Sequence, residues 1–271
     1  MIKLLAVDLD GTCLDDNNNF PLPTLNALKK AQKSGVEVVI CTGRAFDCLP
    51  TAIKKESFYR YAICSNGALI FDREKGERIY NNSVNYLEFI PILKECQRLN
   101  LGITLTVGCQ HIIEGEKLYL MAKSFFKSDV DKSILTADAV SYLLSRKENV
   151  EEIQIFYSSK NLSQINSMIE KYKTLSSSLS SLYVEFYALN GGKGSGLKVL
   201  AKALNVEREE IAVCGDSPND IPMFKEAGLK FCVANASDSL KELATHQVES
   251  SNEFGVKTAV DIILNLNENF S

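Results

Sequence analysis

The sequence predicts an α/β protein with a doubly wound, parallel-sheet core and an inserted α+β domain. Near both ends of the chain, short apolar runs alternate with amphipathic helical patterns, as they do where helices cover both faces of a parallel sheet. In the middle of the chain the strand-like runs instead alternate apolar with polar residues, which is typical of half-exposed antiparallel strands. We therefore expect a core of residues 1–81 and 190–271 and an insertion of residues 82–189.

Three strands and two helices are expected in the first part of the core. Each strand is a short apolar run, as expected for strands that are buried on both faces. The first helix has one apolar face and stops near Ser34 and Gly35. The expected strands are residues 2–7, 36–41 and 61–64, and the expected helices are the segment with Leu25, Leu28 and Ala31 and residues 45–55.

The insertion and the last part of the core follow. In the insertion, a helix with one apolar face accompanies strands of period-two alternation, and the serine-rich stretch 176–181 is expected to be a solvated loop. Beyond it, a helix leads to another apolar strand, residues 211–214, and Pro218 stands near the start of the next helix. The apolar positions are Phe89, Ile90, Leu93 and Cys96 in the first helix, Ile103, Leu105, Val107, Ile153, Ile155, Tyr157, Leu182, Val184 and Phe186 in the strands, and Leu197, Leu200 and Leu204 in the last helix.

The composition supports a soluble enzyme. With 271 residues, of which 45% are hydrophobic and 24% charged, the chain can bury a sizeable core, and its net charge of −4 gives no reason to expect a nucleic acid or a membrane as partner. No stretch approaches the length of a membrane span, and the apolar start is too short for a secretion signal, so we expect a cytoplasmic protein. A monomer and a weak homodimer both remain open.

Cysteine and histidine chemistry is not expected. The 8 cysteines form no C-x-x-C pair, and several lie in or beside apolar runs, where cysteine acts as a small hydrophobe. The histidines are His111 and His246, and neither lies in a motif, which argues against a histidine-based zinc site or triad. Any acid or base must come from another side chain.

Acidic residues follow two apolar runs that are far apart in the sequence. Asp8 and Asp10 close the first run, and Asp216 and Asp220 follow the run that ends at Gly215. Each pair alone also fits an ordinary turn or helix cap. If the two strands are neighbours, the acids meet at the carboxyl edge of the sheet, where α/β proteins bind ligands. Carboxylates about 4 Å apart repel by roughly 4 kcal/mol per pair at an effective dielectric of 20, so such a cluster requires a cation, and oxygen ligands favour Mg2+.

Two further motifs fit an anion at the same edge. Thr42 and Gly43 follow the second strand, where a hydroxyl and backbone amides at a helix start can bind an anionic oxygen, although an ordinary helix cap fits equally well. Lys193 stands among glycines ahead of a helix and supplies a point charge for phosphate, although a solvated lysine is the common alternative. The glycine spacing around Lys193 does not match the nucleotide-binding pattern G-x-x-x-x-G-K-[ST].

Taken in order, these motifs resemble those of the haloacid dehalogenase superfamily. More narrowly, the large insertion between the second and third motifs is similar to that of the Cof-type phosphatases with a type IIB cap. This resemblance implies a Rossmann-like core with a cap domain. The segments that carry it are Asp8 to Thr12, Thr42 to Arg44, Lys193 and Gly194, and Gly215 to Asp220, together with Ser65 to Ala68 and Val233 to Ala236.

The resemblance also implies roles for individual residues. In this family the acid at the place of Asp8 attacks phosphorus and forms an aspartyl-phosphate, while the acid at the place of Asp10 serves as general acid and base and contacts the metal through its backbone carbonyl. The expected catalytic residues are Asp8, Asp10, Thr42 and Lys193, the expected Mg2+ ligands are Asp8, Asp10, Asp216 and Asp220, and the expected substrate-binding residues are Thr42, Gly43, Asn66, Lys193 and Asn219.

The implied function is a Mg2+-dependent phosphatase that hydrolyses small phosphorylated metabolites, such as sugar phosphates or a phosphorylated vitamin. The cap would select the group attached to phosphate and would exclude macromolecules. Two alternatives use the same pocket. A phosphomutase would return the phosphoryl group to a sugar, and a non-catalytic protein would only bind the phosphometabolite, although a binder has no need of a nucleophile.

Overall fold

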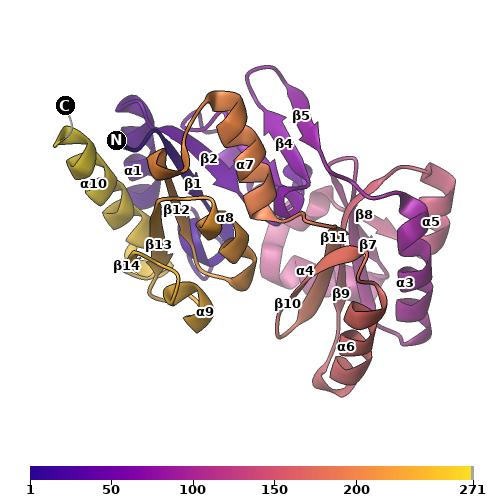
Figure 1. Ribbon diagram of the computed structural model, residues 1–271. Helices are drawn as coiled ribbons and strands as arrows, with labels where there is room; N and C mark the ends of the chain where they lie inside the picture. Colours follow the sequence, from indigo (N-terminus) through magenta and orange to yellow (C-terminus); the bar gives the residue numbers. More distant parts are fainter. Residues whose placement is uncertain (270–271) are drawn as a thin grey trace. The chain divides into compact units, whose positions relative to one another are not determined.

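The computed structural model describes residues 1–269, apart from the side chains of residues 125–129, and the chain divides into two compact units (Figure 1). The core unit comprises Met1–Gly43, Thr51–Tyr80 and the chain from Gly192 onward. The inserted unit comprises Arg44–Pro50 and Asn81–Gly191. The short segment Arg44–Pro50 thus belongs to the inserted unit, although it follows directly after the predicted anion-binding residues Thr42 and Gly43.

Within residues 1–269, the core unit has one eight-stranded sheet in the order β14-β13-β12-β1-β2-β3-β4-β5. Every neighbouring pair from β14 to β3 is parallel, and β4 is antiparallel to β3. All of β1 is buried, which explains why its sequence is apolar throughout rather than alternating. The strands are β1 (Leu4–Val7), β2 (Glu37–Cys41), β3 (Tyr61–Cys64), β4 (Leu69–Asp72), β5 (Glu77–Asn81), β12 (Ile211–Gly215), β13 (Leu229–Val233) and β14 (His246–Val248).

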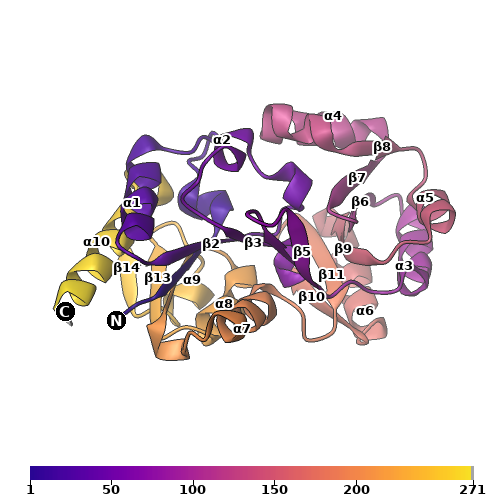
Figure 2. The same ribbon diagram turned by 90° about the horizontal axis from the view of Figure 1, so that it is seen from above.

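Helices cover both faces of this sheet. Figure 2 shows α1 and α10 packed together on one side, and α7 and α8 packed together on the other. The predicted fold class, an α/β protein with a doubly wound parallel core, is confirmed. The helices of the core unit are α1 (Leu22–Lys33), α2 (Thr51–Lys54), α7 (Lys193–Leu204), α8 (Ile221–Lys225), α9 (Asp238–Lys241) and α10 (Gly255–Glu268).

The inserted unit has its own sheet, which in the described chain has six strands in the order β10-β11-β9-β6-β7-β8. The pairs from β10 to β7 are antiparallel, as the alternating pattern predicted, and β8 is parallel to β7. Its strands are β6 (Gly102–Val107), β7 (Gln110–Glu114), β8 (Ile134–Thr136), β9 (Val150–Phe156), β10 (Leu175–Leu179) and β11 (Tyr183–Ala188), and its helices are α3 (Tyr86–Arg98), α4 (Glu116–Phe126), α5 (Ala139–Arg146) and α6 (Leu162–Lys171).

The two faces of the inserted sheet differ in chemistry. One face packs apolar residues against α3, α5 and α6 to form the core of this unit, with Phe89, Ile153 and Phe186 among its fully buried side chains. The other face carries polar side chains at the alternate positions. There Thr104 donates to Gln154 at 3.2 Å and Gln154 donates to Glu185 at 3.0 Å, so a hydrogen-bonded row crosses three neighbouring strands.

Two predicted elements are wrong. The expected helix over residues 45–55 is instead a short turn, Phe46–Cys48, followed by α2, because Leu49 is extended (φ −58°, ψ 140°), as the ring of Pro50 requires of the residue before it. The serine-rich stretch 176–181, expected to be a loop, lies largely in the edge strand β10. Pairing with β11 supplies its backbone hydrogen bonds, and this tertiary contact overrides the weak local preference of serine.

Among the residues that the structure describes, no helix combines the length and the apolar character needed to cross a bilayer.

Candidate active site

The two predicted acid turns lie side by side at the carboxyl edge of the core sheet. β1 and β12 are parallel neighbours with Val7 opposite Cys214. The Asp8 amide continues this pairing by donating to the Cys214 carbonyl at 3.0 Å. The register of the sheet therefore places Asp8 next to the turn that begins with Asp216.

Gly11 lets the first acid turn pass close to the second. Its φ is +79°, in the left-handed region, and a Cβ at this position would lie 2.6 Å from Asp216 Oδ2. The next residue, Thr12, is buried and donates its hydroxyl to Asp216 Oδ1 at 3.0 Å. No function was predicted for Thr12 from the sequence, although the position of a hydroxyl directly after the acid-glycine turn could have indicated one. Its hydrogen bond restricts how the Asp216 carboxylate can rotate.

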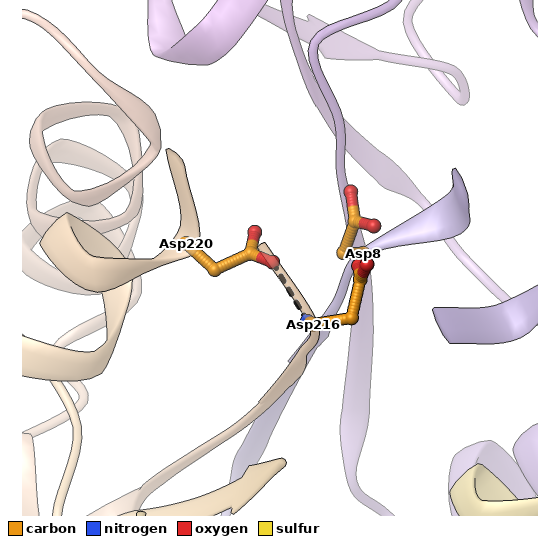
Figure 3. A group of neighbouring side chains, drawn as sticks. All are labelled: Asp8, Asp216 and Asp220. Carbon is orange, nitrogen blue, oxygen red and sulfur yellow. Dashed lines mark hydrogen bonds between the residues drawn. The ribbon is translucent and has the colours of Figure 1, made fainter. Parts of the chain in front are cut away.

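The carboxylates of Asp8, Asp216 and Asp220 form one group among the described residues, because one oxygen of each lies within 4.8 Å of the others (Figure 3). Asp220 comes from the short turn Pro218–Asp220 and is fully buried. Its Oδ2 accepts hydrogen bonds from the amides of Asp216 and Ser217, at 2.9 and 3.1 Å. The backbone of the second turn thus fixes the third carboxylate beside the other two.

Lys193, the first residue of α7, provides the positive charge of this group. Its side chain is only 1% exposed, and its Nζ lies 2.6 Å from both Asp8 Oδ1 and Asp220 Oδ1. Burial alone would lower the pKa of Lys193, but the charges of Asp220 and Asp8 outweigh burial and raise it well above its usual value. The lysine is therefore a fixed ammonium rather than the solvated side chain that its glycine-rich surroundings also allowed.

Burial also dominates the ionisation of the carboxyl groups. Desolvation raises the pKa of Asp8 well above its usual value; Lys193 acts against this shift, while Asp220 and Asp216 add to it. Desolvation, followed by the charge of Asp220, raises the pKa of Asp216 to about 7. The positive charge of the Lys193 ammonium therefore does not offset the negative charge of the three carboxylates. Full ionisation of these carboxylates at neutral pH requires a further cation.

The carboxylate of Asp10 is not part of this group. Asp10 lies in the turn Leu9–Cys13, with an extended backbone (φ −76°, ψ 117°), and it is partly buried. The structure thus brings together the side chains of Asp8, Asp216 and Asp220, whereas the Asp10 carboxylate lies outside this group. Its roles as acid, base and backbone metal ligand stay predictions.

The predicted phosphate-binding residues form a connected set in the core unit. Thr42 is fully buried, and its amide donates to the Ile63 carbonyl at 2.9 Å. The Asn66 amide donates to the Thr42 carbonyl at 3.2 Å, and Asn66 Oδ1 accepts from Asn219 Nδ2 at 3.1 Å. A Cβ on Gly43 would lie 3.2 Å from Asn66 Oδ1, so the absence of a side chain there lets the two loops approach. These contacts link the second motif to the fourth.

Comparisons with known proteins agree with this fold and site. A family model described as haloacid dehalogenase-like hydrolase matches residues 5–260, so the chain belongs to this family. Phosphatase YwpJ of Bacillus subtilis (strain 168) is 30% identical over 94% of this chain and 97% of its own. The 5-amino-6-(5-phospho-D-ribitylamino)uracil phosphatase YwtE of the same organism is 26% identical over 97% of this chain and 98% of its own.

Solved structures give the same result. A haloacid dehalogenase-like hydrolase from B. subtilis is similar with a TM-score of 0.86 and 26% identity, and the match covers 96% of this chain and 99% of that chain. The predicted membership of the haloacid dehalogenase superfamily, of the Cof type, is therefore confirmed. The chain is a phosphoric monoester hydrolase.

Proposed function

We propose that this protein is a Mg2+-dependent phosphatase that hydrolyses phosphorylated metabolites of the sugar phosphate or phosphorylated vitamin type through an aspartyl-phosphate on Asp8. The observation that carries the proposal is the buried group of Asp8, Asp216 and Asp220, with Lys193 bonded to two of its members. Such a group is costly to bury without further positive charge, and it supplies only the hard oxygen ligands that Mg2+ prefers.

The donor set fits a magnesium ion. Asp8 and Asp216 would hold it directly, with Asp220 in support and the Asp10 carbonyl as a backbone ligand. Mg2+, when bound, offsets the repulsion between a carboxylate nucleophile and a phosphate dianion. Burial raises the pKa of both Asp8 and Asp216, so added positive charge also favours the ionised form that a nucleophile and a ligand need.

Asp8 is the nucleophile of the proposed reaction. Its oxygen forms a bond to phosphorus while the bond from phosphorus to the ester oxygen breaks, and the leaving alkoxide takes a proton from Asp10. Water then attacks the aspartyl-phosphate, Asp10 accepts a proton from that water, and phosphate leaves with Asp8 restored. The hydrogen bond from Lys193 to Asp8 Oδ1 fixes the rotation of the carboxylate before attack.

Neutral and basic groups hold the phosphoryl oxygens in this proposal. Thr42 offers a hydroxyl, Gly43 a backbone amide and Lys193 a charge, which is most valuable as negative charge spreads over the transferring group. Asn66 and Asn219, bonded to each other at 3.1 Å, would orient the phosphate or the substrate.

The inserted unit is proposed to be the cap that selects the organic part of the substrate. We place its boundaries near residues 82 and 189, and its polar sheet face, with Thr104, Gln154 and Glu185, offers the hydrogen-bonding groups suited to hydroxyl-rich metabolites. The name of the relative YwtE, a phosphatase of a phosphorylated ribityl compound, supports this substrate class for the present chain.

A phosphate-release screen tests the proposal. Phosphorylated metabolites are incubated with the wild-type protein in Mg2+ or EDTA, beside an Asp8→Asn variant of nearly the same shape. We expect release in Mg2+, and a loss of about 10³-fold or more in EDTA and in the variant, because the nucleophile and its charge partner are removed. Full turnover by Asp8→Asn would overturn the covalent role. An isomerised sugar phosphate without free phosphate would identify a phosphomutase instead.

A further inference from the structure

The loop that follows β13 contacts both acid turns of the core unit. Asn235 Nδ2 donates to the Gly11 carbonyl at 2.8 Å, across a sequence separation of 224 residues. Two residues later, the Ser237 amide donates to the Asp216 carbonyl at 2.8 Å. Gly11 directly follows Asp10, so one short loop holds the turn of the proposed acid and the turn of a proposed metal ligand.

Asn235 is itself anchored on its other side. Its Oδ1 accepts a hydrogen bond from the Ser251 amide at 3.0 Å. Because a carbonyl only accepts and an amide N–H only donates, this arrangement fixes which end of the Asn235 side chain faces Gly11. Asn235 therefore ties the first acid turn to the backbone that follows β14, even though its own side chain is exposed.

The position of this hydrogen bond matters because Gly11 has the greatest conformational freedom of any residue in the turn. Its backbone lies at φ +79° and ψ −3°, and glycine has access to more conformations than any other residue. The hydrogen bond to its carbonyl restrains the peptide plane between Gly11 and Thr12. The orientation of that peptide plane influences the position of the Thr12 hydroxyl relative to Asp216. Through the backbone of Gly11 it also influences the orientation of Asp10.

We propose that Asn235 is a positioning residue that keeps Asp10 within reach of the leaving oxygen. This inference rests on the proposed phosphatase function, in which Asp10 gives that oxygen its proton. Asn235 acts on Asp10 indirectly, through its hydrogen bond to the carbonyl of the neighbouring residue Gly11.

Misplacing Asp10 would affect some substrates and not others, whereas a general loss of structure would affect all substrates alike. A poor leaving group, such as the alkoxide of an aliphatic phosphate ester, needs the proton from Asp10, whereas p-nitrophenolate leaves without it. Since kcat/KM reports steps up to the transfer of phosphoryl to Asp8, misplacing the acid lowers kcat/KM for the aliphatic ester alone. General acid catalysis contributes about 10²- to 10⁴-fold, so a partial misplacement is expected to cost at least about 10-fold.

The test measures kcat/KM for p-nitrophenyl phosphate and for the aliphatic phosphate ester that the wild-type protein hydrolyses fastest. Asn235→Asp keeps the acceptor for Ser251 and removes the donor to Gly11, and Asn235→Ala removes both. Asn252→Ala is the matched control, because Asn252 ties the same two segments through Asp16, with hydrogen bonds of 2.7 and 3.1 Å, without touching Gly11.

We expect the ratio of kcat/KM for the aliphatic ester to kcat/KM for p-nitrophenyl phosphate to fall about 10-fold or more in both Asn235 variants and to stay unchanged in Asn252→Ala. This ratio does not depend on how much of each variant is folded. Equal losses on both substrates, or the same fall in Asn252→Ala, would overturn the positioning role. A wild-type protein that hydrolyses neither substrate would instead overturn the proposed function.

Discussion

At the residue scale, the described side chains of the site carry more buried acidic groups than buried positive charge. Lys193 pairs with Asp8 and Asp220, while the Asp216 carboxylate accepts a hydrogen bond from the Thr12 hydroxyl. Burial raises the pKa of Asp8 and of Asp216. A structural ion pair has no need of a third carboxylate, so this imbalance favours a site built for a cation.

The raised pKa of Asp216 gives a pH prediction for the metal-free protein. Its pKa is about 7 in the folded state and 3.8 ordinarily, so the folded protein holds the proton more tightly than the unfolded chain. The stability from this group is fully present below pH 3.8 and is lost as the pH rises through 7. We expect Asp216→Asn, which cannot ionise, to have a higher Tm than wild type in EDTA at pH 8, and a smaller advantage at pH 5.

Thermal unfolding in EDTA and in Mg2+ checks this prediction. Mg2+ should raise the Tm of the wild-type protein more at pH 8 than at pH 5, because the ion binds the ionised carboxylates, and it should raise that of Asp216→Asn little. An equal Tm difference between the two proteins at both pH values would contradict the raised pKa.

At the element scale, the sequence predicted the ends of buried strands, but it did not predict features that depend on contacts between distant segments. The apolar runs that became β1 and β12 could be recognised, and so could the acids that follow them, because strands buried on both faces leave a continuous apolar signal. The hydrogen bond from Asn235 to Gly11 could not be predicted, since no local pattern reports a contact across 224 residues.

Two elements show how local and tertiary effects compete. Pro50 ends the expected helix at residues 45–55 through a purely local constraint that the sequence already contained. The serine-rich strand β10 forms for the opposite reason, because β11 provides its hydrogen-bonding partners. Strand assignment at a sheet edge thus depends on the neighbour more than on composition.

The polar face of the inserted sheet leads to a prediction about specificity. If this face reads the organic group, Glu185→Gln removes a charge that accepts a hydrogen bond from Gln154 and should weaken recognition of the preferred metabolite. We expect the ratio of kcat/KM for that metabolite to kcat/KM for p-nitrophenyl phosphate to fall about 10-fold, a loss typical of one hydrogen bond to a charged group.

Steady-state kinetics on the two substrates make this measurement. Glu148→Gln is a suitable control, because Glu148 lies in the same unit but is exposed and paired with Arg146 at 2.8 Å. A ratio that changes equally in both variants, or in neither, would contradict a role of the polar face in substrate selection.

At the scale of the whole molecule, the chemistry and the proposed selection belong to different units. All the predicted site residues lie in the core unit, which is assembled from three separate stretches of chain. The sequence predicted one insertion, but the chain also leaves the core unit for Arg44–Pro50, immediately after Gly43. The assignment of residues 44–50 to the inserted unit could not be predicted from composition, because it depends on contacts that these residues make with that unit.

In the proposed reaction Asp8 attacks phosphorus from within a carboxylate group that binds Mg2+. The most direct measurement is an acid quench of the wild-type protein during turnover, followed by mass spectrometry that locates any added phosphoryl group. We expect a phosphoryl group on Asp8 in Mg2+, and none in EDTA or in Asp8→Asn. Steady turnover with the phosphoryl group on another residue would show that Asp8 is not the nucleophile.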